Sequence, residues 1–229
     1  MKIVSWNCGW KYWTGIKHSE IIEYEPDILG ISECNAKEKL PPQAAKDCIH
    51  WAGQPGTMRI KGVAAFLLKQ GLDCKLADGK YFTENNPVKY SIPLCVTTDS
   101  LKFNLLFYRK CDLTKWQAQW DFYADFITQQ STIIIGDFNC PSTDRDARNL
   151  TESLARYGLV HVQPAARDEC DHEIAATFYP HNNKVNLIID YCFASKELMS
   201  KLNLRIGSKE KWIDTGLSDH CPLILDIAE

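Results

Sequence analysis

The sequence predicts an α/β fold in which two packed sheets are covered by helices. Short apolar runs bounded by polar or turn residues predict strands at 2–8, 27–33, 62–68, 92–97, 102–108, 132–137, 186–194 and 221–227. Several of these runs are apolar at consecutive positions, which is typical of strands that are covered on both faces. The runs within 92–108 are hairpin-like, so two sheets packed against each other are the expected architecture.

Three stretches between these strands predict helices. They lie at 16–24, 114–130 and 147–157. In the second stretch, apolar residues recur at helical spacing and predict a stripe that faces the core, made of Trp116, Trp120, Tyr123 and Ile127. Gly158 follows the third stretch and is a natural helix stop.

Length and composition favour a single domain over residues 1–229. A chain of 229 residues with 45% hydrophobic content is long enough for one sizeable core. We see no internal repeat or linker, and turn residues predict irregular connections at 70–91 and 163–184. The net charge of -3 and the pI near 6.1 exclude a strongly basic nucleic-acid coat, although they allow a local basic groove.

The cysteines and the N-terminus predict a soluble, cytoplasmic protein. None of the ten cysteines forms a C-x-x-C pair, and most lie in apolar runs, which favours a reducing compartment and argues against a zinc cluster. The N-terminal "MKIVSWN" already has the pattern of a strand and leaves no room for a signal peptide. No apolar run approaches the roughly 20 residues that span a bilayer.

Polar residues with catalytic potential lie at the ends of the predicted strands or, for Asp190, within one. They are Asn7, Glu33, Asp137, Asn139, Asp190, Asp219 and His220. Taken singly, each is an ordinary turn or strand-end residue. Together, carboxylates and amides that converge near one histidine form an oxygen-rich site suited to Mg²⁺, and the imidazole can accept a proton from water. This combination indicates metal-assisted phosphoester hydrolysis.

The chain resembles the endonuclease/exonuclease/phosphatase superfamily, whose members include DNase I-like and exonuclease III-like enzymes. The resemblance is carried by "IVSWNCGW", "DILGISE", "KGVAAFL", "IIIGDFNCP", "IIDYCFAS" and "LSDHCPLILDI", which occur in the family's order and approximate spacing. It covers essentially the whole chain. It implies a four-layer α/β/β/α sandwich of two mainly antiparallel sheets, with the active site at one rim.

The resemblance also implies a metal site. Glu33 is expected to be the principal ligand of Mg²⁺, with Mn²⁺ as a possible substitute, because a carboxylate offers the anionic oxygen that this ion prefers. Asn7 is expected to support the same metal or the scissile phosphate. Asp219 is expected to approach the metal directly or through water.

Catalytic roles follow from the same resemblance. His220 is similar to the family's general base or phosphate-contacting residue, and Asp190 to the carboxylate that fixes its tautomer. Asp137 is expected to orient or activate the attacking water, and Asn139 to donate a hydrogen bond to the phosphate.

Substrate contacts are less clearly marked by the sequence. Many relatives carry a histidine or tyrosine on the strand at 102–108, and here Tyr108 or Arg109 is the candidate phosphate contact. Trp10 and Lys11 follow Asn7 and combine a base-stacking ring with a positive charge. DNA-repair relatives often have a polar residue soon after "WN", where this chain has Cys8 and Gly9, which weakens an apurinic-endonuclease assignment specifically.

Three functions remain open at this point. The leading one is a magnesium-dependent phosphodiesterase, an endonuclease or exonuclease that acts on DNA or RNA, with no membrane and no obligate protein partner. The second is a phosphatase or phosphodiesterase for a small phosphorylated metabolite or lipid headgroup. The third is a non-catalytic binding module. The short chain favours a nuclease or a small phosphodiesterase, because specificity in this superfamily depends on inserted loops.

Overall fold

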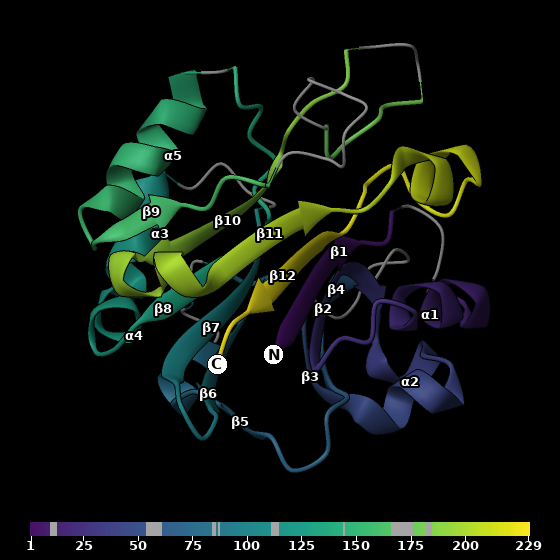
Figure 1. Cartoon of the computed structure of the whole chain (residues 1–229), viewed down its shortest axis with the longest axis horizontal. Helices are drawn as coiled ribbons and strands as arrows, with labels where there is room; N and C mark the ends of the chain where they lie inside the picture. The colour runs from purple at the N-terminus through teal and green to yellow at the C-terminus, as the bar shows by residue number, and fades with distance from the viewer. Residues whose placement is uncertain are drawn as a thin grey trace.

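The computed structural model consists of two six-stranded sheets packed face to face (Figure 1). It describes residues 1–9, 13–53, 61–83, 86, 88–110, 115–143, 145–165, 176–181 and 185–229. The first sheet has the order β11 (Leu202–Ile206), β12 (Leu223–Ile227), β1 (Lys2–Asn7), β2 (Ile28–Asn35), β4 (Lys61–Leu67) and β3 (Cys48–Gly53). The second has the order β5 (Asp73–Leu76), β6 (Ser91–Thr97), β7 (Lys102–Arg109), β8 (Thr132–Asp137), β10 (Asp190–Ser195) and β9 (Leu159–His161).

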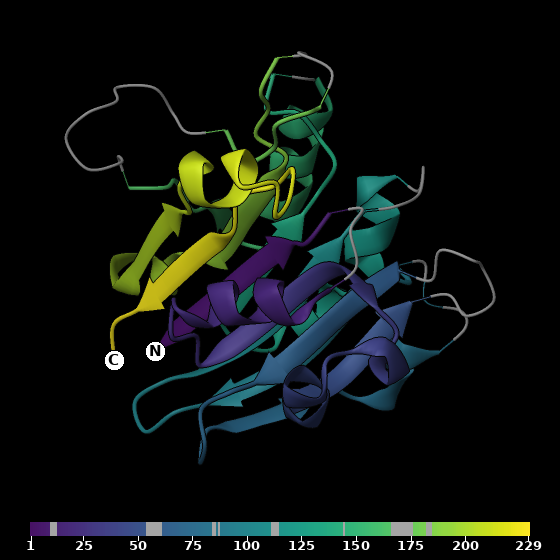
Figure 2. The ribbon, with the colours of Figure 1, turned by 90° about the vertical axis from the view of Figure 1, so that its right-hand side faces the viewer.

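Helices cover the outer face of each sheet. They are α1 (Gly15–Ile22), α2 (Pro42–Asp47), α3 (Trp116–Phe122), α4 (Ala124–Thr128) and α5 (Arg145–Ala155), with short helical turns at Lys37–Lys39, Gly79–Phe82, Lys196–Lys201 and Glu210–Asp214. Helices α1 and α2 lie over the first sheet, and in Figure 2 they face the viewer. Helices α3 to α5 pack on the second sheet. None of the helices that the structure describes has the length and apolarity of a membrane-spanning segment.

Both sheets have a central parallel pair, and their other neighbours are antiparallel. The parallel pairs are β1 with β2 and β7 with β8. Because parallel strands end at the same edge of a sheet, each pair presents two strand ends side by side. The side chains of Asn7 on β1 and Asp137 on β8 are hydrogen-bonded, so the ends of both pairs meet at one rim of the sandwich.

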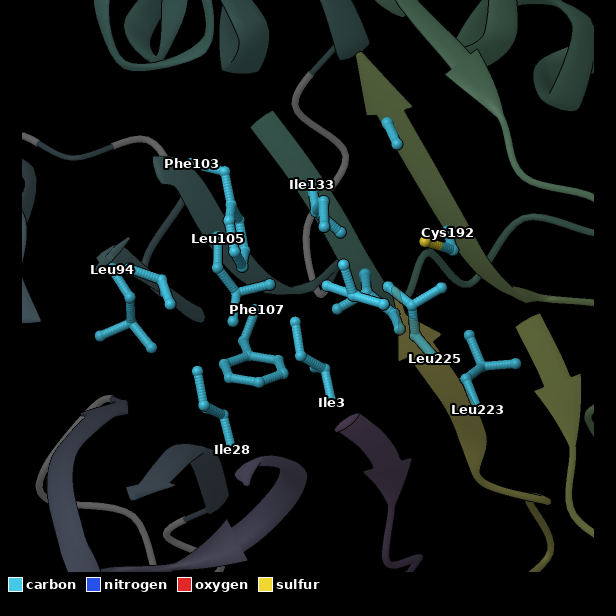
Figure 3. Packing of buried hydrophobic residues seen from close by; sticks show 14 of the residues in the cluster. Ile3, Ile28, Leu94, Phe103, Leu105, Phe107, Ile133, Cys192, Leu223 and Leu225 are labelled. Carbon is cyan, nitrogen blue, oxygen red and sulfur yellow. The ribbon is translucent and has the colours of Figure 1, made fainter. Parts of the chain in front are cut away.

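The layer between the sheets is apolar and closely packed (Figure 3). On β7, Phe103, Leu105 and Phe107 point into this layer, whereas Leu106 and Tyr108 belong to the cluster beneath α3 to α5. This alternation is the period of two expected of a strand. A Cβ atom on Gly30 of β2 would lie 2.1 Å from the Phe107 ring, so the absence of a side chain there lets the two sheets approach.

The predicted sandwich of two helix-covered sheets is confirmed, and all eight predicted strands are present. The four strands that were not predicted, β3, β5, β9 and β11, are the four edge strands of the two sheets. Each of these edge strands has at most one buried residue, so none contains the continuous buried run of an interior strand. The expectation that 70–91 is wholly irregular is wrong, because β5 and a helical turn lie within it.

The three predicted helical stretches are helical, with one difference, and α2 was not predicted. The stretch 114–130 contains two helices, α3 and α4, which meet at Tyr123, where φ is -92° and ψ is 6°. The predicted stripe of Trp116, Trp120, Tyr123 and Ile127 is buried, as expected. Gly158 adopts a φ of 77° shortly after α5, which confirms the predicted stop.

We predict that Gly30→Ala will destabilise the protein by about 1–3 kcal/mol, the usual scale of overpacking in a core. The added methyl group would press on Phe107 and separate the sheets. Urea denaturation measures the change. Gly15→Ala is the matched control, because nothing lies within 4 Å of the corresponding Cβ position at the start of α1. Equal stability of the two variants would contradict the close approach at Gly30.

Candidate active site

The first sheet contributes Asn7 and Glu33 to the rim. Glu33 occupies a β-bulge, because Ser32 and Cys34 pair with the successive residues Val63 and Gly62 of β4. Its φ of 57° lies in the left-handed region, which is unfavourable for a non-glycine residue and is found preferentially at functional sites. A bulge changes the direction of a side chain. Here the Glu33 carboxylate reaches across to the second sheet, where it contacts Arg109.

The second sheet contributes three groups in register. Arg109 of β7 lies beside Asp137 of β8, and Asp137 lies beside Asp190 of β10. These positions follow from strand pairing alone. The sheet therefore places one guanidinium and two carboxylates in a row along the rim.

Asp137 is the most heavily hydrogen-bonded of these residues. Its carboxylate accepts from Asn7 Nδ2 at 2.9 Å, from the Asn139 backbone N–H at 2.9 Å and from Asn139 Nδ2 at 3.1 Å. The second hydrogen of the Asn139 amide goes to the carbonyl of Lys110 at 2.7 Å. The geometry of Asn139 therefore fits the positioning of Asp137 better than the expected donation to a substrate phosphate.

Asp190 and His220 form a buried pair. The imidazole Nδ1 of His220 donates to Asp190 Oδ2 at 2.9 Å, and the two side chains are only 6% and 5% exposed. The Thr177 hydroxyl accepts from the Asp190 backbone N–H at 3.1 Å, and the Phe178 ring lies 4.8 Å from the imidazole. This bond orients the imidazole through Nδ1 and leaves Nε2 as the second ring nitrogen.

Burial and charge change the proton affinities of two of these groups. Burial on its own would lower the pKa of His220, but the carboxylates of Asp190, Asp137 and Asp219 raise it to about 9. Burial raises the pKa of Asp137, and the nearby Asp190 carboxylate adds to the increase. Shifted pKa values are typical of sites that transfer protons.

The stretch Ser218 to His220 is fastened to the end of β1. The Ser218 hydroxyl donates to the carbonyl of Asn7 at 2.8 Å and accepts from the His220 backbone N–H at 3.0 Å. Gly9 has a φ of 72°, and a Cβ atom there would lie 2.8 Å from Asp219 Oδ1. The glycine that departs from the DNA-repair pattern therefore makes room for the Asp219 carboxylate beside β1.

An ion pair joins Glu33 to Arg109 across the two sheets. Arg109 Nη2 lies 2.9 Å from Glu33 Oε1, and Arg109 Nε lies 4.0 Å from Asp137 Oδ2. This pair connects the two residues that we expected to hold metal and substrate. The sequence contains no signal for it, because the partners are 76 residues apart on different sheets.

The other three residues predicted to contact substrate are Tyr108, Trp10 and Lys11. The expectation for Tyr108 is wrong: its side chain is fully buried beneath α3, where its hydroxyl donates to Gln119 and its ring contacts Trp120. Alternation along β7 turns Tyr108 away from the rim and Arg109 toward it. Trp10 and Lys11 lie outside the described residues.

Two supporting residues were not assigned a role from the sequence. Thr177 holds the backbone before Asp190, although the segment 163–184 was expected to be an irregular connection. Ser218 was visible within "LSDH", but its function as a clamp on β1 depends on contacts with a residue 211 positions away. Hydroxyl side chains beside a motif are weak signals, because serine and threonine are common in turns.

The donor atoms at the rim suit a hard cation that retains several waters. Within the described residues, no three His, Cys, Asp or Glu side chains gather closely enough to enclose a metal. Glu33 offers a carboxylate, Asn7 an amide oxygen that also accepts from Gly9 N–H at 2.9 Å, and Asp219 a second carboxylate near β1. Such a sparse oxygen set matches the preference of Mg²⁺ for one or two carboxylates and water.

Comparisons with solved structures identify the fold. The endonuclease domain of TRAS1, a telomere-specific non-LTR retrotransposon, has a TM-score of 0.72 and 16% identity, over 100% of this chain and 98% of that one. The 3′ phosphatase NExo from Neisseria, bound to product DNA hairpin, has a TM-score of 0.66 and 17% identity over 100% of both chains. This chain has the fold of the endonuclease/exonuclease/phosphatase family. Neither a protein-family model nor a curated protein matches it in sequence.

A further structure of this fold is an endonuclease/exonuclease/phosphatase family protein from Leptotrichia buccalis, with a TM-score of 0.64 and 16% identity over 100% of both chains. The expected α/β sandwich of this family is therefore confirmed. Several fold neighbours, among them the TRAS1 endonuclease domain and NExo, are nucleases or phosphatases, that is, phosphoric ester hydrolases.

We predict that Asp190→Asn will lower the pKa of His220 from about 9 toward or below its ordinary value of 6.5. The variant removes the main charge that stabilises the imidazolium, while burial continues to oppose it. NMR titration of the histidine ring in chelator-treated protein measures the change. Asp226→Asn, which removes an exposed partner of Arg205, is the control and should leave His220 unchanged. An unchanged pKa in Asp190→Asn would contradict the pairing.

Proposed function

We propose that this protein is a divalent-metal-dependent phosphodiesterase, most simply a nuclease that hydrolyses DNA or RNA. The observation that carries the proposal is the convergence at one rim of Glu33, the Asn7–Asp137 bond and the Asp190–His220 pair. They come from both sheets and unite an oxygen-donor set, a carboxylate of raised pKa and an oriented imidazole. A fold shared with nucleases and phosphatases supports the same reaction class.

The metal would be held by Glu33, with Asn7 and Asp219 completing the protein ligands. When bound, the cation supplies charge neutralisation on the phosphate and a polarised site for its oxygens. The residues around it supply the orientation. Asn7 serves two functions in this scheme. Its amide N–H donates to Asp137 and positions that carboxylate. Its amide oxygen, which accepts from the Gly9 N–H, would be the metal ligand.

Asp137 is our candidate for the group that takes the proton from the attacking water. Burial and the neighbouring Asp190 raise its pKa, which makes its carboxylate a stronger base than an exposed aspartate. Hydrogen bonds from Asn7 and Asn139 fix its orientation. A positioned general base of this kind typically increases a reaction rate by about 10²–10⁴-fold.

His220 fits the second of its two expected roles, the phosphate contact. With a pKa of about 9 the ring is protonated at neutral pH, so Nε2 is a charged donor and not a proton acceptor. A charged donor stabilises the negative charge that gathers on the phosphoryl oxygens. Asp190 positions this donor and maintains its charge.

Hydrolysis by the purified protein tests the proposal. Labelled single- and double-stranded DNA, RNA and a generic phosphodiester would be incubated with Mg²⁺, with Mn²⁺ and with chelator. Metal-dependent cleavage of a polynucleotide is the expected result. Turnover of the small ester alone would contradict a nuclease and indicate a phosphodiesterase for a small metabolite. Metal binding without turnover of any substrate would favour a binding module.

We predict that His220→Ala will lower the rate by at least ~100-fold, because it removes the charged donor from the transition state. Steady-state rates on the confirmed substrate measure this. His50→Ala is the control, since His50 lies on the edge strand β3 and packs on Phe82. Turnover by His220→Ala at the rate of the control would exclude His220 from the reaction.

We predict that Glu33→Gln will require a much higher Mg²⁺ concentration for half-maximal rate. The substitution keeps the shape of the side chain but removes the anionic oxygen that this cation prefers. Glu38→Gln, at an exposed position in the turn after β2, is the control. An identical metal dependence in both variants would show that Glu33 is not the ligand.

A further inference from the structure

The Arg109–Glu33 ion pair places a positive charge within the proposed cation site. The guanidinium places one charged N–H group 2.9 Å from Glu33 Oε1, and the two side chains are 18% and 12% exposed. At this low exposure the attraction is screened less than at the surface. A charged group of the chain itself therefore occupies the carboxylate that a metal would need.

The position of Arg109 is set by the fold. It follows Phe107 by two residues on β7, so alternation turns it toward the first sheet. The guanidinium also lies 5.7 Å from the centre of the Tyr90 ring, a distance at which a cation is attracted to an aromatic face. These contacts hold the Arg109 guanidinium at the rim, where its Nε lies 4.0 Å from Asp137 Oδ2.

Arg109 also retains an unused donor. Its Nε–H is buried and has no hydrogen-bond acceptor among the described residues. A buried donor without an acceptor is unfavourable, and a guanidinium fork matches two oxygens of one phosphate. The side chain is therefore incompletely satisfied by Glu33 and suited to an additional anionic oxygen.

We propose that Arg109 is an internal counter-ion of Glu33, which a divalent cation displaces when it binds, and that the released guanidinium then binds the substrate phosphate. This inference rests on the proposed metal site at Glu33. Arg109 lowers the affinity for metal in the absence of substrate, because the cation competes with a charge already present. A phosphate that draws the guanidinium away removes this competition and restores the affinity.

Metal and substrate consequently bind with positive coupling. By linkage, a phosphate that releases Glu33 favours the metal to the same extent that the metal favours the phosphate. Arg109 is a specificity-determining residue in this scheme: it favours loading of the metal together with an anionic substrate.

Metal binding measured without turnover tests the proposal. Mn²⁺ affinity would be determined by the EPR signal of the free ion for the wild-type protein, Arg109→Met and Glu33→Gln. We predict that Arg109→Met binds Mn²⁺ about tenfold more tightly than wild type, within the usual range of coupling between sites. Arg205→Met is the matched control, because Arg205 forms an equivalent pair with Asp226 at the surface and should leave the affinity unchanged.

The variants separate two kinds of failure. Weaker binding by Glu33→Gln together with unchanged or weaker binding by Arg109→Met would overturn the counter-ion role while leaving the metal site intact. Binding by Glu33→Gln equal to wild type would overturn the proposed metal site itself. Thermal unfolding of each variant verifies that it is folded, since Arg109→Met leaves the Glu33 carboxylate without this cation.

A second measurement tests the proposal in the wild-type protein, with Arg109 in place. In wild-type protein labelled with ¹⁵N-arginine, the Nε–H signal of Arg109 is assigned by its absence in Arg109→Lys. Mg²⁺ should shift this signal, because the guanidinium loses Glu33, and the Arg205 signal should stay in place. A phosphorothioate dinucleotide added with Mg²⁺ should shift it again. An Arg109 signal unaffected by Mg²⁺ would overturn the proposal.

Discussion

The face-to-face packing of the two sheets is the interaction on which the rest of the structure depends. The apolar layer between them sets their separation, and the close contact of Gly30 with Phe107 brings β2 near β7. The polar groups at the rim lie on strands of these sheets or on the segments that adjoin them, as Asn139 and His220 do. The relative position of the sheets therefore determines which of these groups can meet, and small displacements of the core would separate them.

Two contacts join the sheets at the rim and differ in chemical character. Asn7 and Asp137 form a neutral-to-charged hydrogen bond that is almost fully buried, and it serves to orient a carboxylate. Glu33 and Arg109 form an ion pair with some exposure to solvent. The first is suited to a permanent function because burial makes it costly to break. The second is accessible to ions and phosphates, which makes it suited to exchange.

The sequence predicted the interior of the fold better than its borders. Interior strands such as β1 and β8 are covered on both faces and therefore appear as continuous apolar runs. Edge strands such as β5 and β11 have at most one buried position each, so they are recognisable only by the neighbour to which they bond. The break between α3 and α4 was likewise hidden, because the apolar stripe continues through it.

For the site, the sequence by itself determined the chemical types of the residues and their places at strand ends, as with Asn7, Asp137 and His220. Only the tertiary structure decided how they point and pair. A bulge redirects Glu33, and pairing across the sheets gives it Arg109 as a partner. Alternation places Tyr108 on the far face. These features depend on register and on contacts between distant residues, whereas local patterns reflect only burial and turn preference.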